Sequence, residues 1–367
     1  MRIFYASDTS PNSAFESSLW RNNLYLPLID LGHEVIEFQY DAIRETFQKV
    51  DTKRAKHKRF IKENRPRLTY ELLKQIKTVH KENPIDMFFS YFYDACVLPE
   101  TIDEIKSMGI KTVNWYCNGS YQLHLVEDIS PHYDWCLVPE KFRLNDYNKM
   151  GANPIYCQEA ANPNIYKPYE LPYDYDVSFV GQAYGDRPSY IKYLQEQDIN
   201  INVFGLGWEK FSASAVENRT HNKPLKKLFY KFQKPIIMPN NILGGILSDT
   251  EMVQMYSRSK INIGFSTCGN THKSRNRILQ VRLRDFEVPM SGGFYIVEYM
   301  DELEEFFKIG KEIVCYKNKE DLADKIKYYL QHDDERETIR KAGYERCIKE
   351  HSWHNRFKMA FSEMDIK

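Results

Sequence analysis

Short apolar runs alternate with longer amphipathic segments along most of the chain. Helical patterns separate the runs; the first spans Glu16 to Leu31 and ends before Gly32, a common residue just past a helix. Strands that alternate with helices in this way predict βαβ units and a parallel sheet. In the first half, the predicted strands are Arg2–Ala6, Glu34–Gln39, Asp86–Tyr91, Lys111–Tyr116, Trp135–Pro139 and Pro154–Cys157.

A second alternation of the same kind begins at Val177. Its predicted strands are VSFVG from Val177, INVFG from Ile201, Ile261–Phe265, Phe294–Val297 and Glu312–Tyr316. Its predicted helices are Arg187–Gln197, Asp249–Ser259, one that opens at Asn318 and a final helical segment from about Glu335.

A loop rich in proline and tyrosine, Asn162–Asp176, separates the two alternations and is typical of an interdomain linker. The sequence therefore predicts two Rossmann-like α/β domains that face a central cleft, with ligands beyond the carboxyl ends of the strands. The expected domains are residues 1–170 and 171–350. Residues 351–367 are expected to form a helix that crosses back to the first domain.

Composition narrows the class of protein. The chain has 367 residues, of which 42% are apolar, and its 51 basic residues balance 51 acidic ones. This balance gives no global charge that would favour nucleic acid. Two segments are locally basic, Lys49–Arg67 and Lys223–Lys234. A solvated helix face is the ordinary interpretation of each, and contact with an anionic lipid surface or an anionic acceptor is the functional one.

The cysteines and the amino-terminal region bear on the compartment. The seven cysteines are scattered and never form CxxC, which favours a reducing compartment over disulfides or a metal framework. Asp8 interrupts any signal-peptide core, and no run is long enough to span a membrane. We expect a cytoplasmic protein, with peripheral contact at the inner membrane face through the two basic segments.

Several common site motifs are absent. No GxGxxG follows the first strand, and the chain has no P-loop, no GxSxG elbow and no HExxH. The pair Asp174 and Asp176 matches a DxD metal motif, but it leads into a strand instead of following one, and we reject it. His351 and His354 are three residues apart and could share a helix face, but no further ligands are patterned nearby, so packing or a polar contact is the preferred interpretation.

The stretch from Arg282 to Leu330 carries the clearest chemical signal. It places Glu287 at the start of a helical segment that ends in a turn, Ser291–Gly293, before an apolar strand. A carboxylate in such a place can accept hydrogen bonds from vicinal hydroxyls such as those of a nucleotide ribose. Adjacent glycines, Gly292 and Gly293, allow a backbone to approach phosphate closely.

Two loops after predicted strands could bind anions. His272 lies in a Gly- and Asn-rich loop with Arg277 close behind, which suits a diphosphate or is ordinary exposed charge. The loop from Gly181 to Arg187 leads into a helix that has Pro188 in its first turn. Backbone N–H groups at that helix start would form an anion site, although a plain βα turn has equal weight.

These segments together resemble the CgeB-like (spore maturation protein-like) glycosyltransferases, which have the GT-B fold. The resemblance is strong from about Val177 to Phe357 and weaker in YLPLIDLGHEVIEFQYD and VNWYC of the first half. The resemblance rests on the order and spacing of several sequence blocks. These are VSFVGQAYGDR, LSDTEMVQMYSRSKINIGFS, RDFEVPMSGGFYIVEY, IGKEIVCY and AGYERCIKEHSWHNR.

The resemblance implies transfer of a sugar from a UDP- or GDP-sugar to a hydroxyl acceptor on a glycan, lipid or protein, with no essential metal or other cofactor. The second domain would hold the nucleotide and the first the acceptor. Glu287 would grip the donor ribose and Arg284 would lie near the donor. The other implied donor-site residues are Gly181, Arg187, Gly292 and Gly293, and Arg277 and Arg282 are our further candidates to meet the diphosphate charge.

One departure concerns the acceptor side. Similar chains often carry Asp after the WYC-type strand, whereas this chain has Asn118, which cannot act as a base. Asp8 and Asp94, which follow predicted first-domain strands, are the better candidates for a catalytic base. Two other functions stay open: a nucleotide-sugar epimerase of the same fold, and a catalytically inactive module that binds sugar nucleotides.

Overall fold

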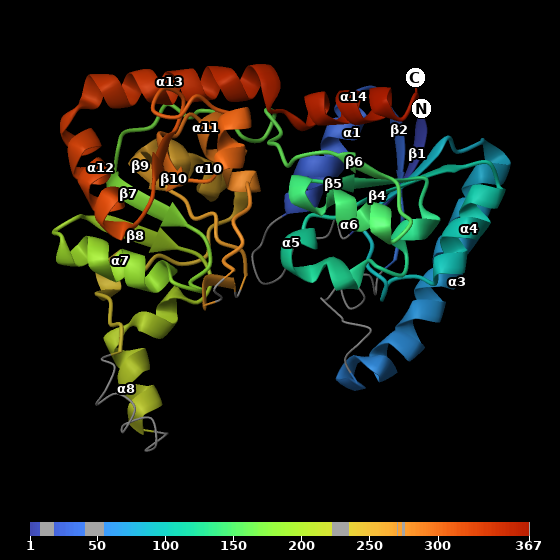
Figure 1. The fold of residues 1–367 in the computed structure, drawn as a ribbon, viewed down its shortest axis with the longest axis horizontal. Helices are drawn as coiled ribbons and strands as arrows, with labels where there is room; N and C mark the ends of the chain where they lie inside the picture. Colours follow the sequence, from blue (N-terminus) through green and yellow to red (C-terminus); the bar gives the residue numbers. More distant parts are fainter. Residues whose placement is uncertain (8–17, 41–54, 222–234, 270, 274–275, 367) are drawn as a thin grey trace. The chain divides into compact units, whose positions relative to one another are not determined.

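The chain divides into two compact units. The computed structural model describes residues 1–7, 18–40, 55–221, 235–269, 271–273 and 276–366. Unit 1 contains β1 (Arg2–Ala6), Ser18–Asn162 and Trp353–Lys367, and unit 2 contains Pro163–Ser352 (Figure 1). The chain passes from one unit to the other at Asn162–Pro163, where the proline- and tyrosine-rich loop begins, rather than at 170/171.

Within the described residues, unit 1 has a parallel sheet of six strands in the order β2-β1-β3-β4-β5-β6. All four residues of β3 are buried, and Phe88 on this strand lies opposite Phe4 of β1. Burial on both faces explains why these strands are continuous apolar runs in the sequence. The strands after β1 are β2 (Glu34–Glu37), β3 (Met87–Ser90), β4 (Lys111–Trp115), β5 (Trp135–Val138) and β6 (Pro154–Tyr156).

The carboxyl-terminal helix completes unit 1. This helix, α14 (Trp353–Glu363), packs against α1 (Leu26–Asp30) and β6. Trp353 is fully buried, and its ring meets that of Trp115 edge-on with centroids 5.2 Å apart. A π-helical turn, Arg21–Tyr25, runs directly into α1. The other helices are α3 (Lys58–Glu82), α4 (Pro99–Ser107), α5 (Gly119–Gln122) and α6 (Leu144–Lys149).

Unit 2 is built on a second parallel sheet, with the order β11-β10-β9-β7-β8 among the described strands. The prediction of two parallel-sheet α/β domains is therefore confirmed. The strands are β7 (Tyr175–Val180), β8 (Ile201–Phe204), β9 (Ser259–Ile263), β10 (Tyr295–Glu298) and β11 (Val314–Tyr316). The helices are α7 (Arg187–Glu196), α8 (Ala213–His221), α10 (Asp249–Arg258), α11 (Leu283–Met290), α12 (Lys319–Gln331) and α13 (Asp333–Glu350).

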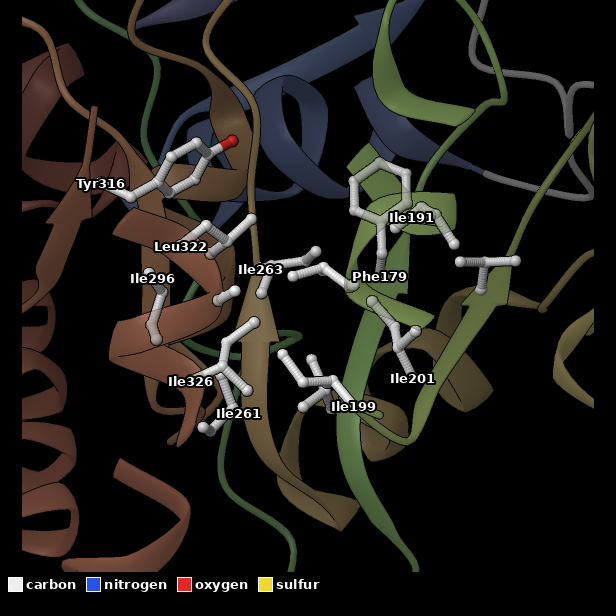
Figure 2. Packing of buried hydrophobic residues seen from close by; sticks show 14 of the residues in the cluster. Phe179, Ile191, Ile199, Ile201, Ile261, Ile263, Ile296, Tyr316, Leu322 and Ile326 are labelled. Carbon is white, nitrogen blue, oxygen red and sulfur yellow. The ribbon is translucent and has the colours of Figure 1, made fainter. Parts of the chain in front are cut away.

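Side chains alternate across the sheet of unit 2 and so create two different faces. Ile261 and Ile263 of β9 join a core with Ile191 of α7 and Ile326 of α12, as Figure 2 shows. Asn262, between the two isoleucines, is buried on the opposite face. Its amide donates to the carbonyl of Tyr256 in α10 (3.1 Å) and its oxygen accepts from the Ser178 hydroxyl (3.1 Å). The sheet is thus held between α7 and α12 on one face and α10 on the other.

None of the described helices is long and apolar enough to cross a membrane.

Candidate functional site

The loop from Gly181 to Arg187 lies at the carboxyl end of β7. The N–H of Gly181 donates to the Phe204 carbonyl (2.8 Å), and its carbonyl accepts from the Trp208 indole (2.7 Å). The amide of Gly181 is therefore engaged by the fold. The amides of Gln182 and Gly185, by contrast, make no hydrogen bond to any residue that the structure describes. Donors without partners just before the start of α7 suit an anion.

Arg187, the first residue of α7, is a buried cation. Its guanidinium donates to the Gln182 carbonyl (3.0 Å) and the Tyr184 hydroxyl (2.9 Å), and it lies over the Tyr184 ring. No carboxylate of the described residues pairs with it, although the side chain is only 8% exposed. Burial, together with the charges of Arg282 and Arg284, lowers the pKa of Arg187 to about 10. A bound anion would supply the missing counter-charge.

Arg277 joins three segments at this end of the sheet. Its guanidinium contacts Glu298 (2.5 Å) and Asp186 (3.4 Å), and its Nε donates to the Thr267 hydroxyl (2.5 Å). Glu298 ends β10, and its Oε2 also accepts from the amides of Ser266 (3.0 Å) and Thr267 (3.2 Å). The network ties the loops after β7 and β9 to β10, and it balances the charge of Arg277 with carboxylates.

Glu298 was not predicted as a site residue. It ends the apolar run FYIVE, so the pattern assigns it to the strand and gives no separate sign of a role. A carboxylate at the carboxyl end of a parallel strand is nevertheless a useful signal, because that edge of the sheet is where ligands bind. A search for carboxylates at the carboxyl ends of the predicted strands would have identified Glu298 from the sequence.

His272 lies beside the loop after β7. It belongs to a short 3₁₀ turn, Thr271–Lys273, and a Cβ added to Gly185 would come within 3.2 Å of its Nδ1. Gly185 has φ +68°, a conformation that favours glycine. The structure therefore brings His272 and Arg277 close to the Gly181–Arg187 loop, so the two loops predicted to bind anions lie next to each other.

Arg282 caps α11 and holds the loop before it. Its backbone N–H donates to the carboxylate of Asp285 (2.8 Å), and its guanidinium donates to the Thr267 carbonyl (2.7 Å). Asp285 is buried and also accepts from the Tyr295 hydroxyl (2.8 Å). Burial raises the pKa of Asp285 to about 6. Arg282 is therefore held in place by contacts within the protein, and its positive charge helps to lower the pKa of Arg187.

Glu287 lies in the middle of α11 instead of at its start, because the helix begins at Leu283. The side chain is 2% exposed, and its Oε1 has no hydrogen-bond partner among the described residues. Its Oε2 lies 3.9 Å from a guanidinium nitrogen of Arg284, which also bonds the Tyr256 hydroxyl. Burial raises the pKa of Glu287, and Arg284 and Tyr166 oppose that shift. Oε1 of Glu287 is therefore a buried carboxylate oxygen that still needs a hydrogen-bond donor.

Gly292 and Gly293 do not join this group. They precede β10 and so lie at its amino end, whereas Glu298 marks its carboxyl end. The Gly292 carbonyl accepts from Arg340 of α13 (3.0 Å), and a Cβ on Gly293 would come within 2.8 Å of the Asn262 amide. The turn is shaped by packing between α11, β10 and α13. The loops described above follow the carboxyl ends of their strands. A turn at the amino end of β10 therefore lies at the opposite end of the sheet from them.

The acids of the rejected DxD pair have partners in the fold. Asp174 pairs with Arg258 (2.6 Å) and Asp176 with Lys260 (2.7 Å). Among the residues that the structure describes, no three His, Cys, Asp or Glu side chains gather as metal ligands do.

The predicted acceptor-side residues have mixed outcomes. Asp94 is buried, and its Oδ1 accepts from the amides of Asp128 (3.1 Å) and Ile129 (3.0 Å), so it braces a loop. Burial raises the pKa of Asp94 to about 7. Asn118 donates to the Tyr91 hydroxyl (3.2 Å) and accepts from that of Tyr121 (3.3 Å). Asp8 lies outside the described residues.

Most of the two basic segments also lies outside the described part of the chain. Residues 223–234 and 49–54 are not described. Residues 58–67 open α3, where Arg59 pairs with Glu63 (2.9 Å) on an exposed face.

Comparison with known proteins gives the class. A family of glycosyl transferase-like proteins matches residues 187–361, just under half of the chain. No curated protein matches the sequence. Three solved structures cover the chain almost completely at low identity, and they show the fold. Sucrose-phosphate synthase from Thermosynechococcus elongatus has TM-score 0.64 and 12% identity, with 100% of this chain and 99% of that one covered.

HepE of Anabaena in complex with UDP has TM-score 0.58 and 12% identity, with both chains covered completely (100%). A putative UDP-N-acetylglucosamine 2-epimerase from Listeria monocytogenes has TM-score 0.53 and 10% identity, with 100% of this chain and 97% of that one covered. The fold is GT-B, with two Rossmann-like domains. The fold and the match over residues 187–361 together define an enzyme of the glycosyltransferase class.

Proposed function

We propose that the protein transfers a sugar from a UDP- or GDP-sugar to a hydroxyl acceptor on a glycan, lipid or protein, as a CgeB-like glycosyltransferase. The observation that supports this most directly is Arg187, a buried cation without a carboxylate partner. It adjoins the unpartnered amides of Gln182 and Gly185. Cation and amides are the two kinds of group that bind a diphosphate. The structural neighbour HepE was solved with UDP, which agrees with a nucleotide at this site.

Glu287 is the proposed partner of the donor ribose. Its Oε1 is buried without a hydrogen-bond donor, and a ribose hydroxyl would provide one. Arg284 lies close to Oε2 and opposes the rise in the pKa of Glu287 that burial causes. Because an ionised carboxylate accepts hydrogen bonds more strongly than a neutral acid, this pairing favours binding of a diol.

The chemistry proposed for unit 2 is stabilisation of the leaving group. During glycosyl transfer the anomeric carbon gains positive charge and the diphosphate gains negative charge. Arg187 and the loop amides would meet that charge without reorganisation, which is the condition for strong electrostatic stabilisation. We further propose that no metal is essential, and that the protein is cytoplasmic and contacts the inner membrane face through its basic segments.

The first prediction concerns Glu287. Replacing it with Ala should weaken UDP or GDP binding by roughly 1–3 kcal/mol, because a hydrogen bond to a charged group is lost. Isothermal titration calorimetry measures this. Glu320→Ala on the exposed face of α12 is the matched control and should leave the affinity unchanged. Equal affinity of wild type and Glu287→Ala would contradict the ribose assignment.

Turnover separates transfer from its alternatives. A panel of UDP-glucose, UDP-N-acetylglucosamine and GDP-mannose is incubated with excess chelator, with and without acceptor. Acceptor-dependent nucleotide release supports transfer. Interconversion of the donor sugar would favour an epimerase, the activity named for the Listeria neighbour. Binding without either reaction would indicate an inactive module, and a strict requirement for Mn²⁺ or Mg²⁺ would contradict the metal-free mechanism.

A further inference from the structure

Two arginines at the carboxyl end of the unit 2 sheet have opposite surroundings. Arg187 is buried, and no carboxylate of the described residues pairs with it. The guanidinium of Arg277 lies between two acids instead, because its Nη2 is 2.5 Å from Oε1 of Glu298 and 3.4 Å from Oδ2 of Asp186. The fold therefore balances the charge of Arg277 and leaves that of Arg187 for a ligand.

Glu298 holds the side chain of Arg277 at two of its nitrogens. Besides the ion pair at Nη2, Nε of Arg277 donates to the Thr267 hydroxyl (2.5 Å), and that hydroxyl donates to Oε2 of Glu298 (3.1 Å). Oε2 also accepts from the amides of Ser266 and Thr267, so the backbone holds the acid in place. The side chain of Glu298 is 5% exposed, whereas that of Arg277 is 34% exposed. Buried hydrogen bonds to a charged group are strong enough to hold an arginine that solvent still reaches.

The two acids lie next to the loop that is proposed to bind the diphosphate. Asp186 belongs to that loop and directly precedes Arg187 at the start of α7. Burial and the charge of Glu298 raise the pKa of the Tyr316 hydroxyl, and the charge of Arg187 opposes that rise. Glu298 and Arg187 thus act on the same hydroxyl. A ligand charge at Arg187 would therefore also be affected by both acids and by Arg277, since salt at physiological strength screens charges only beyond about 8 Å.

The charge of the ligand changes during the proposed transfer. In the donor, the terminal oxygen of the diphosphate carries the sugar. The bond from the anomeric carbon to this oxygen breaks and its electron pair stays on the oxygen, while the sugar bonds to the acceptor oxygen and the acceptor proton leaves to solvent. The nucleoside diphosphate thus carries more negative charge than the donor did. Each further cation in the site would consequently strengthen binding of the product more than binding of the donor.

We propose that Glu298 and Asp186 withhold the charge of Arg277 from the nucleotide and so speed release of the nucleoside diphosphate product. This inference rests on the proposed glycosyl transfer. Arg187 and the loop amides bind the diphosphate, and the two acids keep Arg277 from adding a second unbalanced cation. Product release limits turnover in many enzymes, so a site that holds its product less tightly turns over faster. Glu298 acts through Arg277 and is a positioning residue.

Glu298→Gln tests the proposal, with Glu320→Gln on the exposed face of α12 as the matched control. Gln removes the negative charge, and its carbonyl can still accept from the amides of Ser266 and Thr267. Thermal unfolding checks that each variant folds. Calorimetry measures the affinities for UDP, UDP-glucose, GDP and GDP-mannose at low and high salt. Stopped flow measures the dissociation rate of a fluorescent N-methylanthraniloyl derivative of the diphosphate that binds.

Glu298→Gln should bind the nucleoside diphosphate about 3- to 10-fold more tightly than wild type, because one more cation acts on it. The dissociation rate should fall by a similar factor. The gain should be smaller for the nucleotide sugar, which carries less charge, and smaller at high salt. A purely structural role for Glu298 predicts weaker binding of both ligands. A diphosphate affinity at or below the wild-type value, or an equal gain in Glu320→Gln, overturns the proposal.

Two further variants test whether Arg277 mediates the effect. Arg277→Gln in the Glu298→Gln background should remove the gain, and a gain that persists without Arg277 overturns the proposal. Asp186→Asn should also tighten diphosphate binding, and it tests the same ion pair if Glu298→Gln does not fold. If wild type binds none of the four ligands, the proposed donor site fails and this inference fails with it. A wild type that binds, beside a Glu298→Gln that gains nothing, overturns the inference alone.

Discussion

At the scale of single residues, the carboxylates divide into those with a full set of partners and those with an open oxygen. Glu298 and Asp94 accept several backbone amides and act as braces. Glu287 and Glu140 each keep one buried oxygen without a partner. Sequence reasoning singled out Glu287 from its place before a glycine turn. It did not predict the burial of Glu140, because the residue follows a predicted strand with no motif and contacts α5, which only tertiary structure brings near.

The pKa of Asp94 predicts how stability responds to pH. The folded state raises the pKa of Asp94 to about 7, so it binds a proton that the unfolded chain has already released. Stability should therefore fall as pH rises from about 4 to 7, by about 1.4 kcal/mol per pH unit at most from this group. Chemical unfolding of wild type and Asp94→Asn across this range measures the difference. Asp324→Asn, an exposed change in α12, should keep the wild-type slope, and an unchanged slope in Asp94→Asn would refute the shift.

At the scale of elements, the alternation of strands and helices was readable, but the ends of the strands were less so. The apolar run predicts a strand over Ile261–Phe265, whereas β9 spans Ser259–Ile263. The pairing of β9 with β7 sets the bounds of β9, because Tyr175 of β7 lies opposite Ser259 and Lys260 forms an ion pair with Asp176. Partner strands can thus recruit polar residues that no propensity favours. The end of the sheet that the glycine turn occupies was readable, because a turn that precedes a strand lies at the amino end of that strand. The expectation that this turn meets phosphate did not use that order.

The start of α10 offers a test at this scale. Ser248 accepts from the amide of Glu251 (3.4 Å), and the Glu251 carboxylate accepts from the Ser248 amide (2.8 Å), a capping box. Ser248→Ala should lower the free energy of unfolding of unit 2 by about 1 kcal/mol. Urea unfolding measures it, with Thr250→Ala, an exposed change two residues on, as control. A loss no larger than that of the control would show that the box does not stabilise the helix.

At the scale of the whole molecule, unit 1 takes residues from both ends of the chain. The sequence predicted that residues 351–367 would form a helix with the first domain, and the structure places Trp353–Lys367 in unit 1. The helical pattern and its position made that expectation possible. The partners of Trp353 could not be read from the sequence, because Trp115 is far away along the chain.

Truncating Trp353 should therefore destabilise unit 1 selectively. Its side chain is fully buried against Trp115 and Phe357, and Trp353→Ala should cost about 3–5 kcal/mol. Differential scanning calorimetry should show the transition of unit 1 moving to lower temperature, while that of unit 2 stays in place. Met359→Ala, on the exposed face of the same helix, is the control. An equal shift of both transitions would contradict the assignment of α14 to unit 1 alone.

The cysteines have a practical consequence for following these changes. All seven are free and buried, with Cys96, Cys117, Cys136 and Cys157 in unit 1 and Cys268, Cys315 and Cys347 in unit 2. Burial raises the pKa of Cys136 and Cys315 to about 12, so native thiolate is scarce. A thiol reagent therefore reacts only where the fold has opened. Mass spectrometry of the labelled peptides then measures separately when unit 1 and unit 2 unfold, without an engineered probe.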